Sequence, residues 1–510
     1  MSTVLLVLDG LGITDKVVHN ALMEAKTPTL DKLMNEYPAA RILGAGMAVG
    51  LPGGVSGNSA AGFTNMGAGR IVYQDLVRID KSIETGDFYD NPVLNDTMSY
   101  VKSNDSSLHL IGMISDGGAH SHMNHLYALL ELAKRHDLKR VYVHCITDGN
   151  DTPAYEGINY VEKLRGKMRD LSIGEIASVC GRYYAMDRDN NFDRIKKAYL
   201  CMTTGEGFKA ANPAEAFQTA YDKGETDKNI KPTVIVNGGI PVGSINDEDA
   251  VIFFNYRTDR TRELTRAFCE DEFRMFKRDR KLNLRFVNLT DPDPMIINKF
   301  VAFDTPAINN NFGEYISLCG LKQLRITESE VFPTVTYFFN CGEREPYDNE
   351  ERLIIRSLKD VDSYADHPYM NAEAVTQRLI NEIDDGRYDF ILCNLSNADT
   401  VGHTGNMKAT KKALRGLDKC LEAIMEVVKD TGSTMLVCSS HGKAEEMYDD
   451  EAGAPVLRNT MNPVPCVLVD DTRQLRLKPV GSMADIAPTL LELMGLPIPR
   501  EMTGKSLIIH

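Results

Sequence analysis

The sequence contains no tryptophan, no Cys-x-x-Cys pair and no apolar run long enough to span a membrane. A membrane helix needs about 20 consecutive apolar residues, so we expect no membrane-spanning segment. The ten cysteines are scattered singly over 510 residues, a pattern typical of reduced thiols in a cytoplasmic protein. The first residues lack a basic segment, and Asp9 interrupts the first apolar run, so no signal peptide is expected.

Positive charge is also scarce. The chain has 57 lysines and arginines against 72 aspartates and glutamates, a formal net charge of −15. Such an excess argues against nucleic acid or an anionic membrane as the main partner. A small anionic substrate remains compatible with it, because a few arginines at one place can override the overall field. The length exceeds what one core supports, so two or three domains are expected.

Three short apolar segments are followed at once by polar residues that could bind a metal. They are residues 4–8, 390–395 and 434–438. Apolar side chains at helical spacing over residues 408–430 predict a helix between the last two. This alternation indicates an α/β fold with a parallel sheet, whose ligands bind beyond the carboxyl ends of the strands. Asp9, Asp399 and His441 are therefore expected at one edge.

The middle of the chain has an α/β pattern of its own. We expect strands at residues 108–114, 140–146, 233–236 and 251–254, a helix at residues 123–135, and loops with short helices over residues 203–232. Ligand-bearing strands occur at both ends of the chain. We therefore predict a discontinuous domain of residues 1–74 and 311–510, with residues 75–310 inserted as a second domain.

A serine, Ser59, stands in the segment Gly57-Asn58-Ser59-Ala60-Ala61-Gly62. The glycines allow a close approach of the backbone to a ligand. Taken alone, the segment is more typical of a serine that caps the following helix. A metal ion nearby would instead lower the pKa of the hydroxyl and make Ser59 a nucleophile.

The metal-ligand candidates are aspartate and histidine. Asp399 and His403 are four residues apart, and His441 directly follows a predicted strand. Oxygen and nitrogen donors favour manganese, zinc or magnesium over softer metals. Each residue alone is as typical of a turn or a helix cap. Their joint occurrence with Asp9 and Ser59 is much less expected by chance, so we predict a metal site.

Paired arginines indicate an anion site. Arg182 and Arg188 share one polar loop, and Arg257 and Arg260 share another. The guanidinium fork matches carboxylate and phosphate, although a surface ion pair with a neighbouring aspartate explains a single arginine equally well. His120 lies in a glycine-rich loop after a strand, where contact with phosphate is favoured over a metal site.

Together these segments resemble the cofactor-independent (2,3-bisphosphoglycerate-independent) phosphoglycerate mutases of the alkaline phosphatase superfamily. The resemblance runs nearly end to end and is carried by Gly50-Leu51-Pro52, Gly57-Asn58-Ser59, Gly67-Ala68-Gly69-Arg70-Ile71-Val72-Tyr73-Gln74, Ser115-Asp116-Gly117-Gly118, Gly181-Arg182-Tyr183-Tyr184-Ala185-Met186-Asp187-Arg188-Asp189, Val401-Gly402-His403-Thr404-Gly405 and Met502-Thr503-Gly504-Lys505-Ser506-Leu507. It implies an alkaline-phosphatase-like sheet domain with a second, substrate-binding α/β domain inserted. It also implies a cytoplasmic, monomeric isomerase of glycolysis that interconverts 3-phosphoglycerate and 2-phosphoglycerate through a phosphoserine.

The resemblance assigns roles to individual residues. It implies two Mn²⁺ ions, one at Asp9, Ser59 and His441 and the other at Asp399 and His403. It makes Ser59 the acceptor of the phosphoryl group and Asp151 a proton shuttle at the glycerate hydroxyls. The substrate-binding positions that match the family are His120, Asp151, Arg182, Arg188, Arg257 and Arg260.

The chain departs from the family pattern at several of its site positions. Ser440 replaces an aspartate, Lys443 an asparagine, Asn459 a histidine, Val331 a lysine and Asn150 an arginine. Beside the nucleophile, Ala60 and Phe63 replace a glutamate and a histidine. One strong ligand is therefore missing from each metal site.

The exchanges at 440 and 443 remove one negative charge and add one positive charge, which together equal the charge of a divalent ion. We therefore predict that Lys443 joins the catalytic centre in place of the metal at Asp9, Ser59 and His441, with Asp9 as its ion-pair partner. Three functions stay open. They are a mutase with an altered or impaired metal centre, an enzyme that handles phosphoryl or phosphonate groups on a related hydroxy acid, and a non-catalytic phospho-ligand-binding paralogue.

Overall fold

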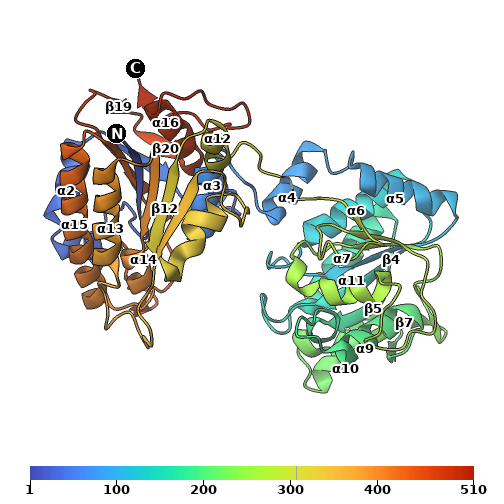
Figure 1. Ribbon diagram of the computed structural model, residues 1–510. Helices are drawn as coiled ribbons and strands as arrows, with labels where there is room; N and C mark the ends of the chain where they lie inside the picture. The colour runs from blue at the N-terminus through green and yellow to red at the C-terminus, as the bar shows by residue number, and fades with distance from the viewer. Residues whose placement is uncertain (306) are drawn as a thin grey trace. The chain divides into compact units, whose positions relative to one another are not determined.

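The computed structural model describes residues 1–305 and 307–510. The chain forms two compact units, one of Met1–Gln74 with Ala307–His510 and one of Asp75–Pro306. In Figure 1 the first unit accordingly carries both the blue and the red end of the chain. All ten cysteines are unpaired. No helix in the described residues is both long and apolar enough to cross a membrane.

The first unit is built on an eight-stranded sheet in which β1 (Thr3–Leu8) is flanked by β14 (Phe390–Leu395) and β15 (Thr434–Cys438). Both neighbours run parallel to β1. The three predicted ligand-bearing strands are thus confirmed as neighbours that end at one edge. The sheet continues through β12 (Gln323–Glu328) and β13 (Glu350–Ile355) on one side and through β18 (Val464–Val469), β2 (Ala39–Leu43) and β20 (Val480–Ser482) on the other.

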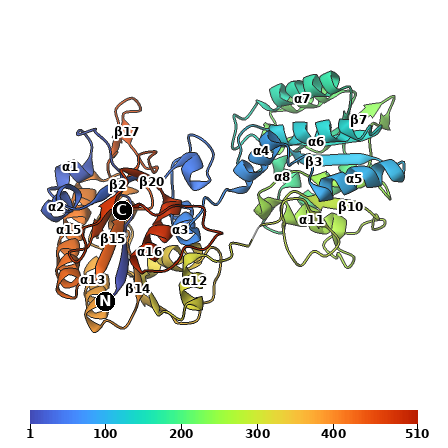
Figure 2. The same cartoon turned by 90° about the horizontal axis from the view of Figure 1, so that it is seen from above.

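Helices bury both faces of this sheet, which explains why its central strands β1, β14 and β15 are mostly apolar. Val4 and Leu6 of β1 pack in one core with the predicted helix, which is confirmed as α15 (Met407–Asp430). Leu5 and Val7 point into the opposite core. Figure 2 shows α13 and α15 on one side of β15 and α3 and α16 on the other. The bounds of the remaining helices are α1 (Ala21–Ala25), α2 (Pro28–Glu36), α3 (Ser59–Ala68), α12 (Phe312–Leu318), α13 (Ala372–Asp385), α14 (Asn397–Gly402) and α16 (Ile486–Leu493).

The second unit has a nine-stranded sheet whose centre is parallel, because β3 (Leu108–Met113) pairs with β4 (Val141–Thr147) and with β9 (Ala250–Phe253). The predicted strands and the predicted helix α6 (Met123–Arg135) are confirmed. The other strands are β5 (Glu175–Gly181), β6 (Phe208–Ala210), β7 (Thr233–Asn237), β8 (Ile240–Pro241), β10 (Arg285–Asn288) and β11 (Phe300–Val301). The segment 203–232 thus holds a strand, β6, in addition to the expected short helices.

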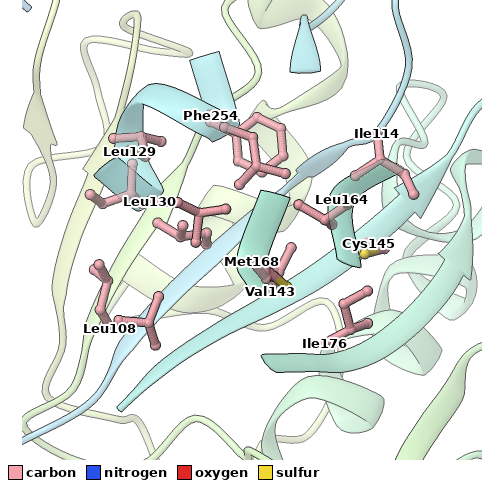
Figure 3. Packing of buried hydrophobic residues seen from close by; sticks show 14 of the residues in the cluster. Leu108, Ile114, Leu129, Leu130, Val143, Cys145, Leu164, Met168, Ile176 and Phe254 are labelled. Atoms are coloured by element: carbon pink, nitrogen blue, oxygen red, sulfur yellow. The ribbon is translucent and has the colours of Figure 1, made fainter. Parts of the chain in front are cut away.

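The core of this unit lies between the sheet and its helices. Figure 3 shows Leu129 and Leu130 of α6 beside Val143 of β4, with Leu164 and Met168 of α7 (Gly157–Leu171) completing the contact. The other helices are α4 (Asp75–Thr85), α5 (Pro92–Ser103), α8 (Arg182–Ala185), α9 (Phe192–Thr203), α10 (Pro213–Asp222) and α11 (Arg262–Cys269). This packing fixes the loops at the carboxyl ends of β3, β4 and β5.

Candidate active site

Ser59 is the first residue of helix α3. The residue that caps this helix is Asn58, whose side-chain oxygen accepts from the backbone N–H of Ala61 at 2.8 Å. The alternative in which Ser59 is the cap is therefore wrong. Its hydroxyl is left to face the end of β1, where Ser59 Oγ donates to Asp9 Oδ2 at 3.5 Å. Because Asn58 caps the helix, the Ser59 hydroxyl is left beside the carboxyl end of β1.

Asp9 lies directly after β1 and is only 1% exposed. Its carboxylate accepts from Asn394 Nδ2 at 3.2 Å, from the backbone N–H of Ser440 at 3.3 Å and from the Ser440 hydroxyl. Burial raises the pKa of the Asp9 carboxyl, and the nearby His441 opposes that rise. Asp9 is thus held by neutral donors.

Asp399, after β14, binds two histidines. Its Oδ1 atom lies 2.9 Å from His441 Nε2 and 3.2 Å from His403 Nε2. Burial alone would raise the pKa of Asp399, but the hydrogen bonds from both imidazoles hold it well below its usual range. The other ring nitrogens are bound as well, that of His441 to Ser440 Oγ at 2.7 Å and that of His403 to the carbonyl of Leu457 at 2.6 Å.

Lys443 is fully buried, and its ammonium donates to the carbonyl of Val456 at 3.0 Å. Within the described residues it forms no ion pair with Asp9, so the predicted partner is wrong. Burial lowers the pKa of Lys443, while the charges of Asp399 and Glu445 oppose that change. The stem of Lys443 also fits against Gly402, where a Cβ atom would lie 2.9 Å from Lys443 Cγ. Lys443 therefore lies on the Asp399 side of the site.

The five predicted metal ligands meet, but they bind one another. Nowhere in residues 1–305 and 307–510 does a group of three or more histidine, cysteine, aspartate or glutamate side chains suit a metal ion. An imidazole nitrogen that donates to a carboxylate carries a proton and has no lone pair for a metal. Asn459, at the position of a family ligand, instead donates to the carbonyl of Gly57 at 2.9 Å. This donor set does not fit two divalent ions.

In the second unit the predicted arginines bind three aspartates and one backbone carbonyl. Arg182, 6% exposed, lies at the end of β5 and binds Asp148 at 2.5 Å and Asp151 at 2.6 Å. Asp259 is within 3.3 Å of Arg188 and 3.2 Å of Arg257. Arg260 donates to the carbonyl of Met186 at 3.1 Å.

His120 joins this cluster at longer range. Its two ring nitrogens lie 3.9 Å from Asp151 and 3.8 Å from Asp259. Burial, helped by the charge of Arg182, lowers the pKa of His120 to about 4. The ring is therefore neutral at pH 7 and able both to donate and to accept a hydrogen bond.

Sequence reasoning missed Asp148 and Asp259. Asp148 follows β4 directly, the same strand-end position that singled out Asp9, and Asp259 lies between two predicted arginines. Both signals were present in the sequence. Among the departures, Phe63 is fully buried in the core beneath α3, and Asn150 Nδ2 donates to Asp151 Oδ1 at 3.2 Å.

Comparison with known proteins decides the family. Residues 79–293 match the family model for the BPG-independent PGAM N-terminus, and residues 326–460 match type I phosphodiesterase / nucleotide pyrophosphatase. The 2,3-bisphosphoglycerate-independent phosphoglycerate mutase of Lachnoclostridium phytofermentans is 47% identical over 508 residues, 99% of each chain. That of Clostridium acetobutylicum is 46% identical over 503 residues, 99% of this chain and 98% of its own. The chain belongs to the 2,3-bisphosphoglycerate-independent phosphoglycerate mutases.

These phosphoglycerate mutases are isomerases, and the predicted family and fold class are confirmed. The crystal structure of Leishmania mexicana phosphoglycerate mutase at low cobalt concentration aligns with a TM-score of 0.61 and 28% identity, covering 100% of this chain and 97% of that one. The family is metal-dependent, which makes the hydrogen-bonded, lysine-containing cluster around Asp399 a departure within it.

Proposed function

We propose that this chain interconverts 3-phosphoglycerate and 2-phosphoglycerate, with Ser59 as the transient phosphoryl acceptor. The observation that carries the proposal is the position of Ser59 at the amino end of α3, 3.5 Å from Asp9. The first backbone N–H groups of a helix and its dipole favour a bound anion. A phosphoryl group on Ser59 Oγ would lie in that field.

The proposed reaction has two matched transfers. Ser59 Oγ forms a bond to phosphorus while the bond from phosphorus to the glycerate oxygen breaks, and that oxygen receives the proton that leaves the Ser59 hydroxyl. The second glycerate hydroxyl then loses its proton to Asp151 and attacks the phosphoserine. The released Ser59 oxygen takes up that proton from Asp151, which regenerates both residues. The proton handling at Asp151 is supported by its contact with Arg182 at 2.6 Å, which favours the ionised carboxylate.

The arginines and His120 are proposed to position the substrate. Arg257 and Arg260 would hold the phosphoryl oxygens, and Arg182, Arg188 and His120 would orient the carboxylate and phosphate ends. The present ion pairs of Arg182, Arg188 and Arg257 with carboxylates support this role, because a guanidinium that donates to a carboxylate suits the similarly shaped anions of the substrate. The unit that carries them is accordingly proposed as the substrate-binding domain.

An enolase-coupled assay on the purified chain tests the proposed function. With 3-phosphoglycerate as substrate, formation of 2-phosphoglycerate should be measurable and should vanish in Ser59→Ala. The assay is run with added Mn²⁺ and with a chelator. Turnover that survives in Ser59→Ala would eliminate the phosphoserine route.

A second candidate is a phospho-ligand-binding protein without turnover. It is favoured by one observation, that Asp399 binds both histidines while Ser440 links Asp9 to His441. In that case 3-phosphoglycerate would raise the melting temperature without any product appearing. Action on a related hydroxy acid, the monomeric state, a cytoplasmic location and the absence of nucleic-acid and membrane partners stay predictions.

A further inference from the structure

Lys443 occupies the side of the site where the family resemblance puts the metal at Asp399 and His403. Its stem packs against Gly402, the residue before His403. Lys443 Nζ and His403 Nδ1 are bonded to the consecutive carbonyls of Val456 and Leu457. One loop therefore fixes both side chains.

On the other side of the site, Ser440 connects the side chains of Asp9 and His441. Its hydroxyl donates to Asp9 and lies 2.7 Å from His441 Nδ1, so it joins two predicted ligands of the other metal, the one expected at Asp9, Ser59 and His441. Gly62 of α3 packs directly on this serine, because a Cβ atom there would lie 2.6 Å from Ser440 Cβ. The helix that carries Ser59 thus rests on the residue that replaces a metal-binding aspartate.

We propose that this unit has exchanged its divalent metal centre for a metal-free one, in which the buried Lys443 side chain packs against Gly402, beside His403, and is anchored to the carbonyl of Val456, while the Ser440 hydroxyl joins Asp9 to His441. The proposal concerns the same site as the proposed function, but it does not depend on turnover. It corrects the sequence-based placement of Lys443, which assigned this residue to Asp9.

A consequence concerns the ligand class. A phosphomonoester bound at Ser59 would be held by the fixed positive charges of the chain, and its binding would be independent of divalent cations. Lys443 is suited to a permanent role because it is fully buried and anchored to a backbone carbonyl. A bound divalent ion would face this ammonium as a like charge.

Metal content provides the direct test. The full chain is incubated with MnCl₂, dialysed, and measured by elemental analysis, with MnCl₂ titration calorimetry in parallel. We expect less than about 0.1 Mn²⁺ per chain after dialysis. The triple variant Ser440→Asp, Lys443→Asn, Asn459→His should retain at least one Mn²⁺ per chain, because it regains the charge and the ligands. Retention of one or two Mn²⁺ ions by the unmodified chain would overturn the proposal.

Two single variants test the same proposal in case the triple variant does not fold. Lys443→Asn should raise the affinity for Mn²⁺ at least about tenfold. The matched change Lys412→Asn, at an exposed position of α15, should leave it unchanged. Equal Mn²⁺ affinity in both variants would contradict a role for Lys443. The two proposals can fail separately. A metal-free chain without mutase turnover would contradict only the proposed function. A chain that retains Mn²⁺ and shows turnover dependent on Ser59 would contradict only the metal-free centre.

Discussion

His441 Nε2 lies 2.9 Å from Asp399 Oδ1, so a residue assigned to one predicted metal ion is bonded directly to a residue assigned to the other. The two side chains come after β14 and β15, the strands that flank β1, and Asp9 follows β1 itself. The bond pairs a partly buried carboxylate with an imidazole of the same chain. The five side chains expected to surround two ions instead form one hydrogen-bonded cluster.

Removing the Ser59 hydroxyl should abolish any mutase turnover, because Ser59 Oγ is the proposed acceptor of the phosphoryl group. The enolase-coupled rate of Ser59→Ala is expected at background. Ser56→Ala, three residues earlier in the same loop, is the matched control and should keep most of the rate. Comparable losses in both variants would point to general disruption of the loop.

The cap of α3 links stability to activity. Asn58→Ala should lower the free energy of unfolding by about 1 kcal/mol, the usual cost of a lost N-cap. Asn406→Ala, which removes the equivalent cap of α15, should cost about the same. Only Asn58→Ala should also reduce kcat, because it frees the turn that holds Ser59. Denaturant unfolding and the coupled assay measure the two effects, and a normal kcat in Asn58→Ala would contradict the link.

The buried and exposed arginines of the second unit should behave differently. Arg182→Met leaves Asp148 and Asp151 without their shared cation and should destabilise the fold by about 3–5 kcal/mol. Arg188→Met removes a pair that is half exposed and should cost less than about 1 kcal/mol. Both should weaken binding of 3-phosphoglycerate in calorimetry. Equal losses of stability would show that the burial of Arg182 carries no extra cost.

His120 should make the fold sensitive to acid. Its pKa is lowered to about 4 in the folded chain, whereas an unfolded histidine titrates near 6.5. Between these values the unfolded chain takes up the proton first, so the contribution of His120 to the free energy of unfolding falls as the pH drops from about 6.5 to about 4. Above pH 7 the contribution is constant.

The pKa itself can be measured by the NMR titration of the His120 ring. The unfolding free energies of the parent and of His120→Gln are then compared at pH 7 and pH 5. The parent should lose more stability than the variant over that interval. Equal losses, or a ring that titrates near 6.5, would refute the prediction.

The sequence alone determined the three central strands of the sheet in the first unit and the edge at which the residues after them meet. Short apolar segments such as residues 4–8 are typical of strands that are buried on both faces of a parallel sheet. The carboxyl ends of such strands meet at one edge, which brings the residues after them together. The arginine loops were equally readable, because several guanidinium groups in a chain of net charge −15 indicate an anion. The family resemblance and the α/β fold class were also readable from the sequence.

Only the tertiary structure decided which groups bind one another. The charge change at Ser440 and Lys443 was visible in the sequence, but the direction of a long, flexible lysine side chain was not. The stem of Lys443 packs against Gly402 and its ammonium binds the carbonyl of Val456, whereas the Ser440 hydroxyl takes the place expected for the ammonium beside Asp9. The position of the backbone after a strand follows from the place of that strand in the sheet. The hydrogen-bond partner of a buried polar group instead depends on atoms that several distant segments bring to within about 3 Å of it.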